Sequence, residues 1–398
     1  MGRDGIAAMS APVTGIQPSV LRWARVSANL TVSDVADKLK RTAAEIEDWE
    51  AGTAAPSYPQ LEKLAYDLYK RPLATFFLPA PPSEPNPRAE FRSLPDQDLD
   101  ALSRDTLLLI RKARAYQFAL EELYGARNPV EPPIWRAVQL STARPVVAQA
   151  ARVREALAVS LDQQREWHDD DEALKRWRRA IEAGGVFVFK NAFKQRELSG
   201  FCLANPEFPV IVVNNSTTKT RQVFSLIHEL AHALLQRNAI SAFDETRIEA
   251  LPVRDRAIER FCNAVAAEVL VPLADFRTQV RTLPANLEAA GDDRFATLAR
   301  RYHVSRAVVL RRMLDDERVS SAFYQAKTAE WDGQREAGGS GGNFHATQNA
   351  YISEKFAREV FARYTRRQIS LDEAADYFDL APKNVEKLQD LVLRGATA

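Results

Sequence analysis

A run of prolines divides this chain near its N-terminus. Residues 79–88 read PAPPSEPNPR and hold five prolines in ten positions. Proline lacks a backbone N–H and clashes with the preceding helical turn, so this run favours an extended linker over a helix. A chain of 398 residues, of which 46% are hydrophobic, can bury two or three cores. We therefore expect a small domain before the prolines and a larger part after them.

The segment before the prolines has the pattern of a five-helix domain at residues 14–78. Thr31 or Ser33 can cap one of these helices, and Thr42 can cap the next, which ends where Gly52 suits a left-handed residue. The expected helices lie at residues 18–28, 32–39 and 43–51, and two more begin near residues 56 and 72.

After the prolines we expect a connector at residues 79–158, a larger domain at 159–335 and a helical segment at 343–398. Short apolar runs predict strands, and longer stretches with helical periodicity predict helices around them. The expected strands lie at 186–189, 197–204 and 210–213, and the helices at 102–124, 146–161, 172–182, 218–236, 258–270, 294–302 and 306–314. The predicted fold class is therefore mainly α with a small β-sheet (α+β).

The C-terminal segment follows GGSGG at residues 338–342, which has the composition of a flexible joint. Helices are expected at residues 347–365, 371–378 and 382–393. Residues 371–385 have the pattern of half a helix-turn-helix.

The run His228-Glu229-Leu230-Ala231-His232 has the HExxH spacing of a zinc peptidase site. Residues four apart share a helix face, so both imidazoles can bind one ion while Glu229 points beside them. Zinc held by two histidines and a carboxylate leaves a position for water and lowers the pKa of that water to about 7. Glu229 would then accept a proton from the water. Two histidines on a helix face without a metal are the simpler alternative.

A third zinc ligand is expected from a later helix, and Glu259 is the best candidate. Asn263 lies one helical turn further and can hydrogen-bond a ligand histidine, which fixes its tautomer. Tyr302 or His303 could stabilise an oxyanion, although capping or packing also accounts for them. The rival carboxylates for the third position are Glu245, Glu249 and Glu268.

The bulk composition restricts the location of the protein. Cys202 and Cys262 form no spacing motif, which favours a reducing cytoplasm. Neither a signal peptide nor a membrane span is recognisable, so we expect a cytoplasmic protein without a membrane partner. The formal net charge of +1 gives no general affinity for nucleic acid, so a DNA-binding role must rest on a local motif.

Two stretches around these residues resemble the ImmA/IrrE family of metallo-endopeptidases. They are RQVFSLIHELAH, from Arg221 to His232, and ERFCNAVAAEVLVP, from Glu259 to Pro272. The resemblance covers roughly residues 160–320. It implies a zincin-like fold, zinc bound by His228, His232 and Glu259, and Glu229 as general base. It also implies substrates among the helix-turn-helix repressors of bacterial stress and mobile-element regulation.

The N-terminal segment is similar to Xre/Cro-type helix-turn-helix domains, which implies a DNA-binding regulator or a partner of a toxin. The similarity rests on LRWAR from Leu21, on IEDWEAG from Ile46, and on the leucines that follow. The expected DNA-contacting residues are Lys38, Lys40, Arg41, Thr42 and Glu45. However, the recognition helix at residues 42–50 carries four acidic residues and no Lys or Arg, which disfavours groove reading. DNA binding and protein docking both remain open.

Three functions fit these patterns. The first is a zinc endopeptidase that cleaves or controls a helix-turn-helix repressor or an antitoxin. The second is a DNA-binding regulator or antitoxin whose metal domain binds a partner, such as the toxin of an adjacent gene, with little proteolysis. The third is a structural zinc site. The intact Glu229 favours the first, because a structural zinc needs no general base.

Overall fold

The computed structural model describes residues 11–84, 90–91, 96–195, 197–242, 245–281, 287–288, 291–336 and 351–395. The glycine joint and the start of the helix expected from residue 347 lie outside these residues. The chain forms two compact units, Met1–Glu90 with Asp96–Arg111, and Phe91–Pro95 with Lys112–Ala398. The boundary falls within a helix, α7, beyond the proline run. The division into four segments made from the sequence stays a prediction.

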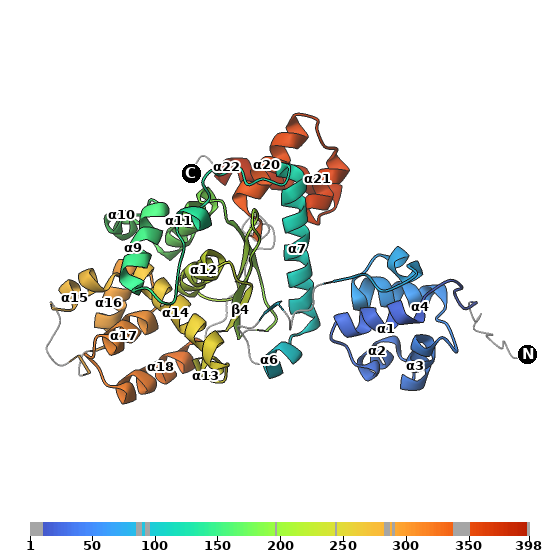
Figure 1. Cartoon of the computed structure of the whole chain (residues 1–398), viewed down its shortest axis with the longest axis horizontal. Helices are drawn as coiled ribbons and strands as arrows, with labels where there is room; N and C mark the ends of the chain where they lie inside the picture. The colour runs from blue at the N-terminus through green and yellow to red at the C-terminus, as the bar shows by residue number, and fades with distance from the viewer. Residues whose placement is uncertain are drawn as a thin grey trace, which may run out of the picture. The chain divides into compact units, whose positions relative to one another are not determined.

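The first unit contains the helices expected before the prolines (Figure 1). Thr31 and Asp34 form a reciprocal capping box at the start of α2, and Thr42 and Glu45 form another at α3. The fourth helix continues as a π-helix, and the fifth is a 3-10 helix. Their bounds are α1 Pro18–Ser27, α2 Val32–Leu39, α3 Ala43–Ala51, α4 Tyr58–Glu62, η1 Lys63–Tyr69 and η2 Leu73–Phe77.

Several helices connect this unit to the sheet. The helix expected at residues 146–161 ends early, because Ala158 takes a left-handed conformation (φ 52°) and Ser160 caps a new helix. The connecting helices are α6 Asp96–Asp100, α7 Arg104–Tyr124, α8 Ile134–Ala137, α9 Val146–Ala156, α10 Leu161–Glu166 and α11 Asp170–Ala183.

A four-stranded mixed sheet lies at the centre of the second unit. Its strands are β1 Phe187–Asn191, β2 Leu198–Leu203, β3 Val210–Asn214 and β4 Ala239–Ala242, in the order β1-β3-β2-β4. β1 and β3 are parallel, and β2 pairs antiparallel with both β3 and β4. The first three strands confirm the prediction. β4 was not predicted, because four residues directly after a helix carry too little alternation to be recognised.

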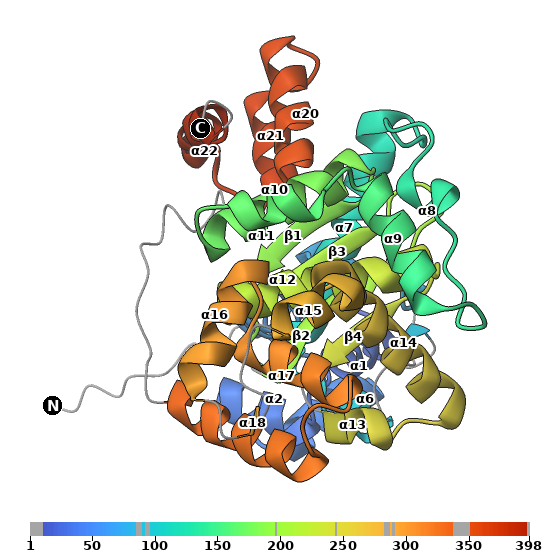
Figure 2. The same cartoon turned by 90° about the vertical axis from the view of Figure 1, so that its left-hand side faces the viewer.

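Helices cover both faces of the sheet. α12 contacts β2 and β3, and α11 contacts β1 on the same face, while Tyr116 of α7 stacks on Phe189 on the other face (Figures 1 and 2). α14 packs on the outer side of α12. The remaining helices follow as α12 Lys219–Leu234, α13 Glu245–Glu249, α14 Val253–Leu270, α15 Leu273–Val280, α16 Asp292–Tyr302, α17 Arg306–Asp315 and α18 Ser321–Glu336.

The C-terminal helices complete the second unit. They are α20 Glu354–Thr365, α21 Leu371–Phe378, η3 Pro382–Asn384 and α22 Val385–Gly395. α20 contacts β1, and Phe356 lies against Phe189. The described chain is thus mainly helical with one small mixed sheet, which confirms the predicted α+β class. Among the described residues, no helix is both long and apolar enough to cross a membrane.

Gly200 allows β2 to fit closely against its neighbours. A Cβ atom at this position would lie 2.8 Å from the Val212 carbonyl oxygen. We expect Gly200→Ala to lower the free energy of unfolding by about 1–3 kcal/mol, because the backbone must shift to relieve the clash. Urea denaturation measures the change. Gly291→Ala is the control, since none of the described residues has an atom within 4 Å of a Cβ there. An equal effect of both changes would contradict the packing argument.

Candidate metal centre

The HExxH run lies in the second half of α12, on the side that faces the protein interior. Thr218 caps this helix by accepting a hydrogen bond from the Arg221 backbone N–H. His228, Glu229 and His232 are 4%, 0% and 1% exposed. Polar side chains buried this deeply need hydrogen-bonding, ionic or metal partners, because they have lost their contact with water.

Glu259 of α14 completes a cluster with the two histidines. Its carboxylate oxygens lie 3.3 Å from His228 Nε2 and 3.1 Å from His232 Nε2, and the two Nε2 atoms lie 3.1 Å apart. Glu259 is 3% exposed. Of the described residues, these three are the group of His, Cys, Asp or Glu side chains whose donor atoms converge as metal ligands do.

The spacing of the cluster fits a tetrahedral zinc ion. With Zn–N distances of about 2.0–2.1 Å, neighbouring ligand atoms lie about 3.3–3.4 Å apart, close to the separations given above. His232 Nδ1 has no hydrogen-bond partner among the described residues, and Glu259 Oε1 faces His232 Nε2 of the same cluster without the geometry of a hydrogen bond. The two Nε2 atoms lie close to each other and to the Glu259 carboxylate. All three groups can donate lone pairs to one cation, whereas two unprotonated nitrogens cannot hydrogen-bond each other. The residues present therefore fit zinc.

Contacts between the Glu259 carboxylate and the two histidines change the pKa values of Glu259 and His228. Burial alone would raise the pKa of Glu259, but the neighbouring His232 and His228 lower it to about 2. Burial opposes protonation of His228, yet the contact with Glu259 outweighs it and raises the pKa of His228. Glu259 is therefore ionised, as a metal ligand must be.

Glu229 is in a different environment from Glu259. Both of its carboxylate oxygens are buried and make no full hydrogen bond among the described residues, although the Ser241 side chain lowers its pKa. Burial raises the pKa of Glu229, although His228 and His232 act in the opposite direction. A carboxylate that gains from taking up a proton, and that is not part of the ligand cluster, has the properties of a general base.

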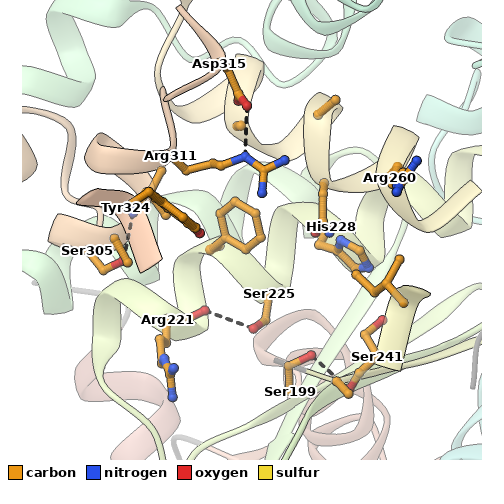
Figure 3. A pocket seen from close by; sticks show the side chains of 18 of the residues that line it. Ser199, Arg221, Ser225, His228, Ser241, Arg260, Ser305, Arg311, Asp315 and Tyr324 are labelled. Carbon is orange, nitrogen blue, oxygen red and sulfur yellow. Dashed lines mark hydrogen bonds and ion pairs between the residues drawn. The ribbon is translucent and has the colours of Figure 1, made fainter. Parts of the chain in front are cut away.

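A cavity of about 400 Å³ opens beside His228. Figure 3 shows Ser199 and Ser241 from the strands on one side of it and Arg311 and Asp315 of α17 on the other. Residues from α12, α14, α17 and α18 form its remaining walls: Arg221, Phe224, Ser225, Arg260, Asn263, Ala264, Ala267, Ala307, Val308 and Tyr324. The metal-ligand cluster is therefore accessible from one side to a molecule larger than water.

The other predicted site residues fall into two groups. Asn263 lines the cavity, and its side chain interacts with His228 and raises the pKa of that ring. Tyr302 and His303 do not line it. The Tyr302 hydroxyl donates to Asp275 at 2.5 Å, and His303 ends α16 in a left-handed conformation beside Asp170. These contacts favour the alternative of packing and capping for both residues, and the oxyanion role stays a prediction.

The rival carboxylates have other partners or lie outside the described side chains. Glu268 pairs with Arg312 at 2.6 Å, and Glu249 pairs with Arg260 at 2.6 Å. The side chain of Glu245 is not described. Sequence patterns did not reveal Ser199, Ser241, Val308 or Tyr324, because strand β4 and the approach of α17 and α18 are long-range features.

The predicted DNA-contacting residues of the first unit have local structural roles. Thr42 and Glu45 cap α3, and Arg41 pairs with Glu45 at 3.6 Å. Lys38 is exposed, and Lys40 ends α2 in a left-handed conformation. Lys38, Lys40, Arg41 and Thr42 are exposed, and Glu45 is half-buried.

Comparison with known proteins supports a metallopeptidase-type domain. Residues 181–314 match the peptidase M78 family model, described as the IrrE N-terminal-like domain. The matched region contains α12 and α14, and hence the ligand cluster, but not the first unit. No curated protein is similar enough to the chain to be counted as a relative.

We expect the purified protein to bind about one zinc per chain, because three buried ligands converge on one point. His228→Ala should lose most of this zinc, whereas Glu229→Gln should keep it, since Glu229 stands outside the cluster. Elemental analysis of the three proteins measures the difference. A metal-free wild type that is correctly folded would rule out the zinc centre.

Asn263→Ala should weaken zinc binding by about 10- to 100-fold, the usual effect of losing a partner of a ligand histidine. Competition with a chromogenic chelator gives the affinity. Arg260→Ala is the control on the same helix, because its side chain pairs with Glu249 rather than with a ligand. Equal affinities of the wild type and Asn263→Ala would show that Asn263 plays no part.

Proposed function

We propose that this protein is a zinc-dependent endopeptidase that cleaves or controls a helix-turn-helix repressor or an antitoxin in the bacterial cytoplasm. One observation carries the proposal. The His228–His232–Glu259 cluster lies at the wall of an open cavity, with the buried carboxylate of Glu229 beside it. A structural zinc needs neither the cavity nor Glu229.

The residues of the chain divide the chemistry between them. His228, His232 and Glu259 would hold the ion, which when bound polarises a peptide carbonyl and makes nearby water more acidic. Glu229 takes the proton from the attacking water and can pass it to the leaving amine. Asn263 orients His228. Because Glu229 is fully buried, bulk water does not compete for its carboxylate.

The sheet offers a way to bind an extended peptide. β4 is the last strand of the described sheet, and its Ser241 and Ala242 line the cavity. An edge strand can pair with a substrate segment through backbone hydrogen bonds, which gives affinity with little dependence on sequence. Peptide segments that are already extended or locally unfolded would therefore be cut in preference to helices.

The first unit supports a role in regulation. Lys40 ends α2 with φ 55°, the Arg41 N–H bonds to the Ala36 carbonyl, and α3 begins after Thr42. This is a tight helix-turn-helix corner. The same corner occurs at His303 between α16 and α17, and at Asp379 between α21 and η3. In all three the N–H after the left-handed residue bonds to a buried alanine: Ala36, Ala299 and Ala375.

The second helices of two of these corners have different surroundings. α17 lines the cavity of the metal centre. The exposed residues of α3 include Glu47 and Asp48 and no basic residue. An acidic face opposes approach to DNA phosphates, so we propose that the first unit docks a protein partner. DNA binding through Lys38 and Lys40 is the alternative.

The peptidase proposal is tested by comparing new protein N-termini in bacteria that express wild type or Glu229→Gln. We expect cleavage products with the wild type and none with Glu229→Gln, because loss of the base stops proton transfer while zinc remains. Immunoblots confirm equal expression of the two proteins. Identical sets of N-termini would leave the second function, partner binding with little proteolysis, as the better account.

The docking proposal predicts that the wild type will not retard its own promoter DNA at low salt, where phosphate contacts are strongest. An electrophoretic mobility assay measures this, with Lys38→Ala/Lys40→Ala as the matched variant. Retardation that disappears in this variant and weakens steeply with salt would favour DNA binding instead.

A further inference from the structure

We propose that the cavity beside the metal centre receives one large apolar side chain of the substrate, and that Ala264 and Ala267 set the size it accepts. This inference rests on the proposed peptidase function and deepens it, because it names what the site selects.

Two helices line the cavity with matching stripes. α12 contributes residues at 221, 224, 225 and 228, and α14 contributes residues at 260, 263, 264 and 267. Both sets follow the spacing i, i+3, i+4 and i+7, so each stripe is one continuous helix face. The α12 stripe ends at His228 of the ligand cluster. A side chain bound between the stripes is therefore adjacent to the bond that the site would cleave.

The cavity has a set of large apolar lining residues and two small ones, beside serines and charged residues. Phe224, Ile248, Val308 and Tyr324 supply aromatic and aliphatic walls. Ala264 and Ala267 also line the cavity, and they leave space unfilled because neither side chain extends beyond Cβ. A volume of about 400 Å³ is large enough for a phenylalanine, leucine or methionine side chain with part of the adjoining backbone.

Four charged residues of the cavity form two ion pairs with exposed side chains. Arg260 contacts Glu249 at 2.6 Å, and Arg311 contacts Asp315 at 2.8 Å (Figure 3). A charged substrate side chain would have to leave water and compete with these pairs, which disfavours its entry. An apolar side chain gains from burial without disturbing them.

Ala264 and Ala267 control the space without holding the metal. Both come after Glu259 on α14, and neither belongs to the ligand cluster. Ala267 is 8% exposed and Ala264 is partly exposed, so a leucine at either position extends into the cavity rather than into the packed core. Ala257, exposed on the same helix and outside this cavity, provides a matched control.

The test uses the zinc-loaded full-length protein and two hydroxamates that bind zinc through the same group. Acetohydroxamate carries only a methyl group, whereas 3-phenylpropanohydroxamate can place a phenyl ring in the cavity. Isothermal titration gives the Kd of each for wild type, Ala264→Leu, Ala267→Leu and Ala257→Leu. Zinc content and circular dichroism show whether each variant is folded.

We expect the phenyl compound to bind wild type and Ala257→Leu about 10-fold tighter or more, the usual size of discrimination by an apolar pocket. In Ala264→Leu and Ala267→Leu this advantage should disappear, while acetohydroxamate binds as before. Ala264→Leu, at the more exposed position, serves if Ala267→Leu does not fold. Equal binding of both compounds to the wild type, or an advantage that survives in the leucine variants, would overturn the inference.

Failure of the proposed peptidase function would give a different experimental result from failure of the subsite inference. In that case the hydroxamates still discriminate as expected, but wild type and Glu229→Gln yield the same protein N-termini. If cleavage occurs and the residues next to the cut sites show no preference for large apolar side chains, the peptidase proposal stands and the subsite inference fails.

Discussion

The packing of α14 against α12 is the contact on which the site depends. It brings Glu259 within 3.3 Å of both histidine Nε2 atoms and thereby removes a carboxylate and two imidazoles from water together. Separately, each burial would be costly, because polar groups lose hydration without gaining partners. Together with a divalent cation they satisfy one another. The same packing places Asn263 beside His228, so the ligand cluster and its supporting contact arise from a single helix pair.

The helix pair also determines the shape of the space for a substrate. The surface of α14 that continues beyond Glu259 carries Ala264 and Ala267, α12 contributes Phe224, and α17 and α18 add Val308 and Tyr324. The sheet supplies the opposite boundary through β4. Gly200 of β2 lies beside Glu229, since a Cβ on that residue would lie 3.5 Å from Glu229 Oε1. Catalytic and binding features thus share one compact set of contacts within the second unit.

Much of the fold could be predicted from local patterns. Helices with a capping residue and a clear apolar stripe, such as α2, α3 and α12, appear close to their expected positions, because capping and periodicity act within a few residues. The predictions were less accurate where tertiary contacts determine whether an element forms or where it ends. β4 exists because β2 offers it a partner, and the helix expected at 146–161 divides because Ala158 adopts a left-handed turn. Tyr302 and His303 were predicted as oxyanion-stabilising residues, but in the structure they contact Asp275 and Asp170, away from the cavity.

By itself, the sequence determined that His228 and His232 share one face of a helix with Glu229 beside them, because residues four apart in an α-helix always do. It also provided Glu259 and Asn263 as candidates one turn apart. Only the tertiary structure decided that Glu259, and not Glu249 or Glu268, meets the histidines, since that depends on how α14 crosses α12. It likewise decided that a cavity lies beside His228. Helical spacing is a local property, whereas the approach of two helices depends on side chains throughout the core.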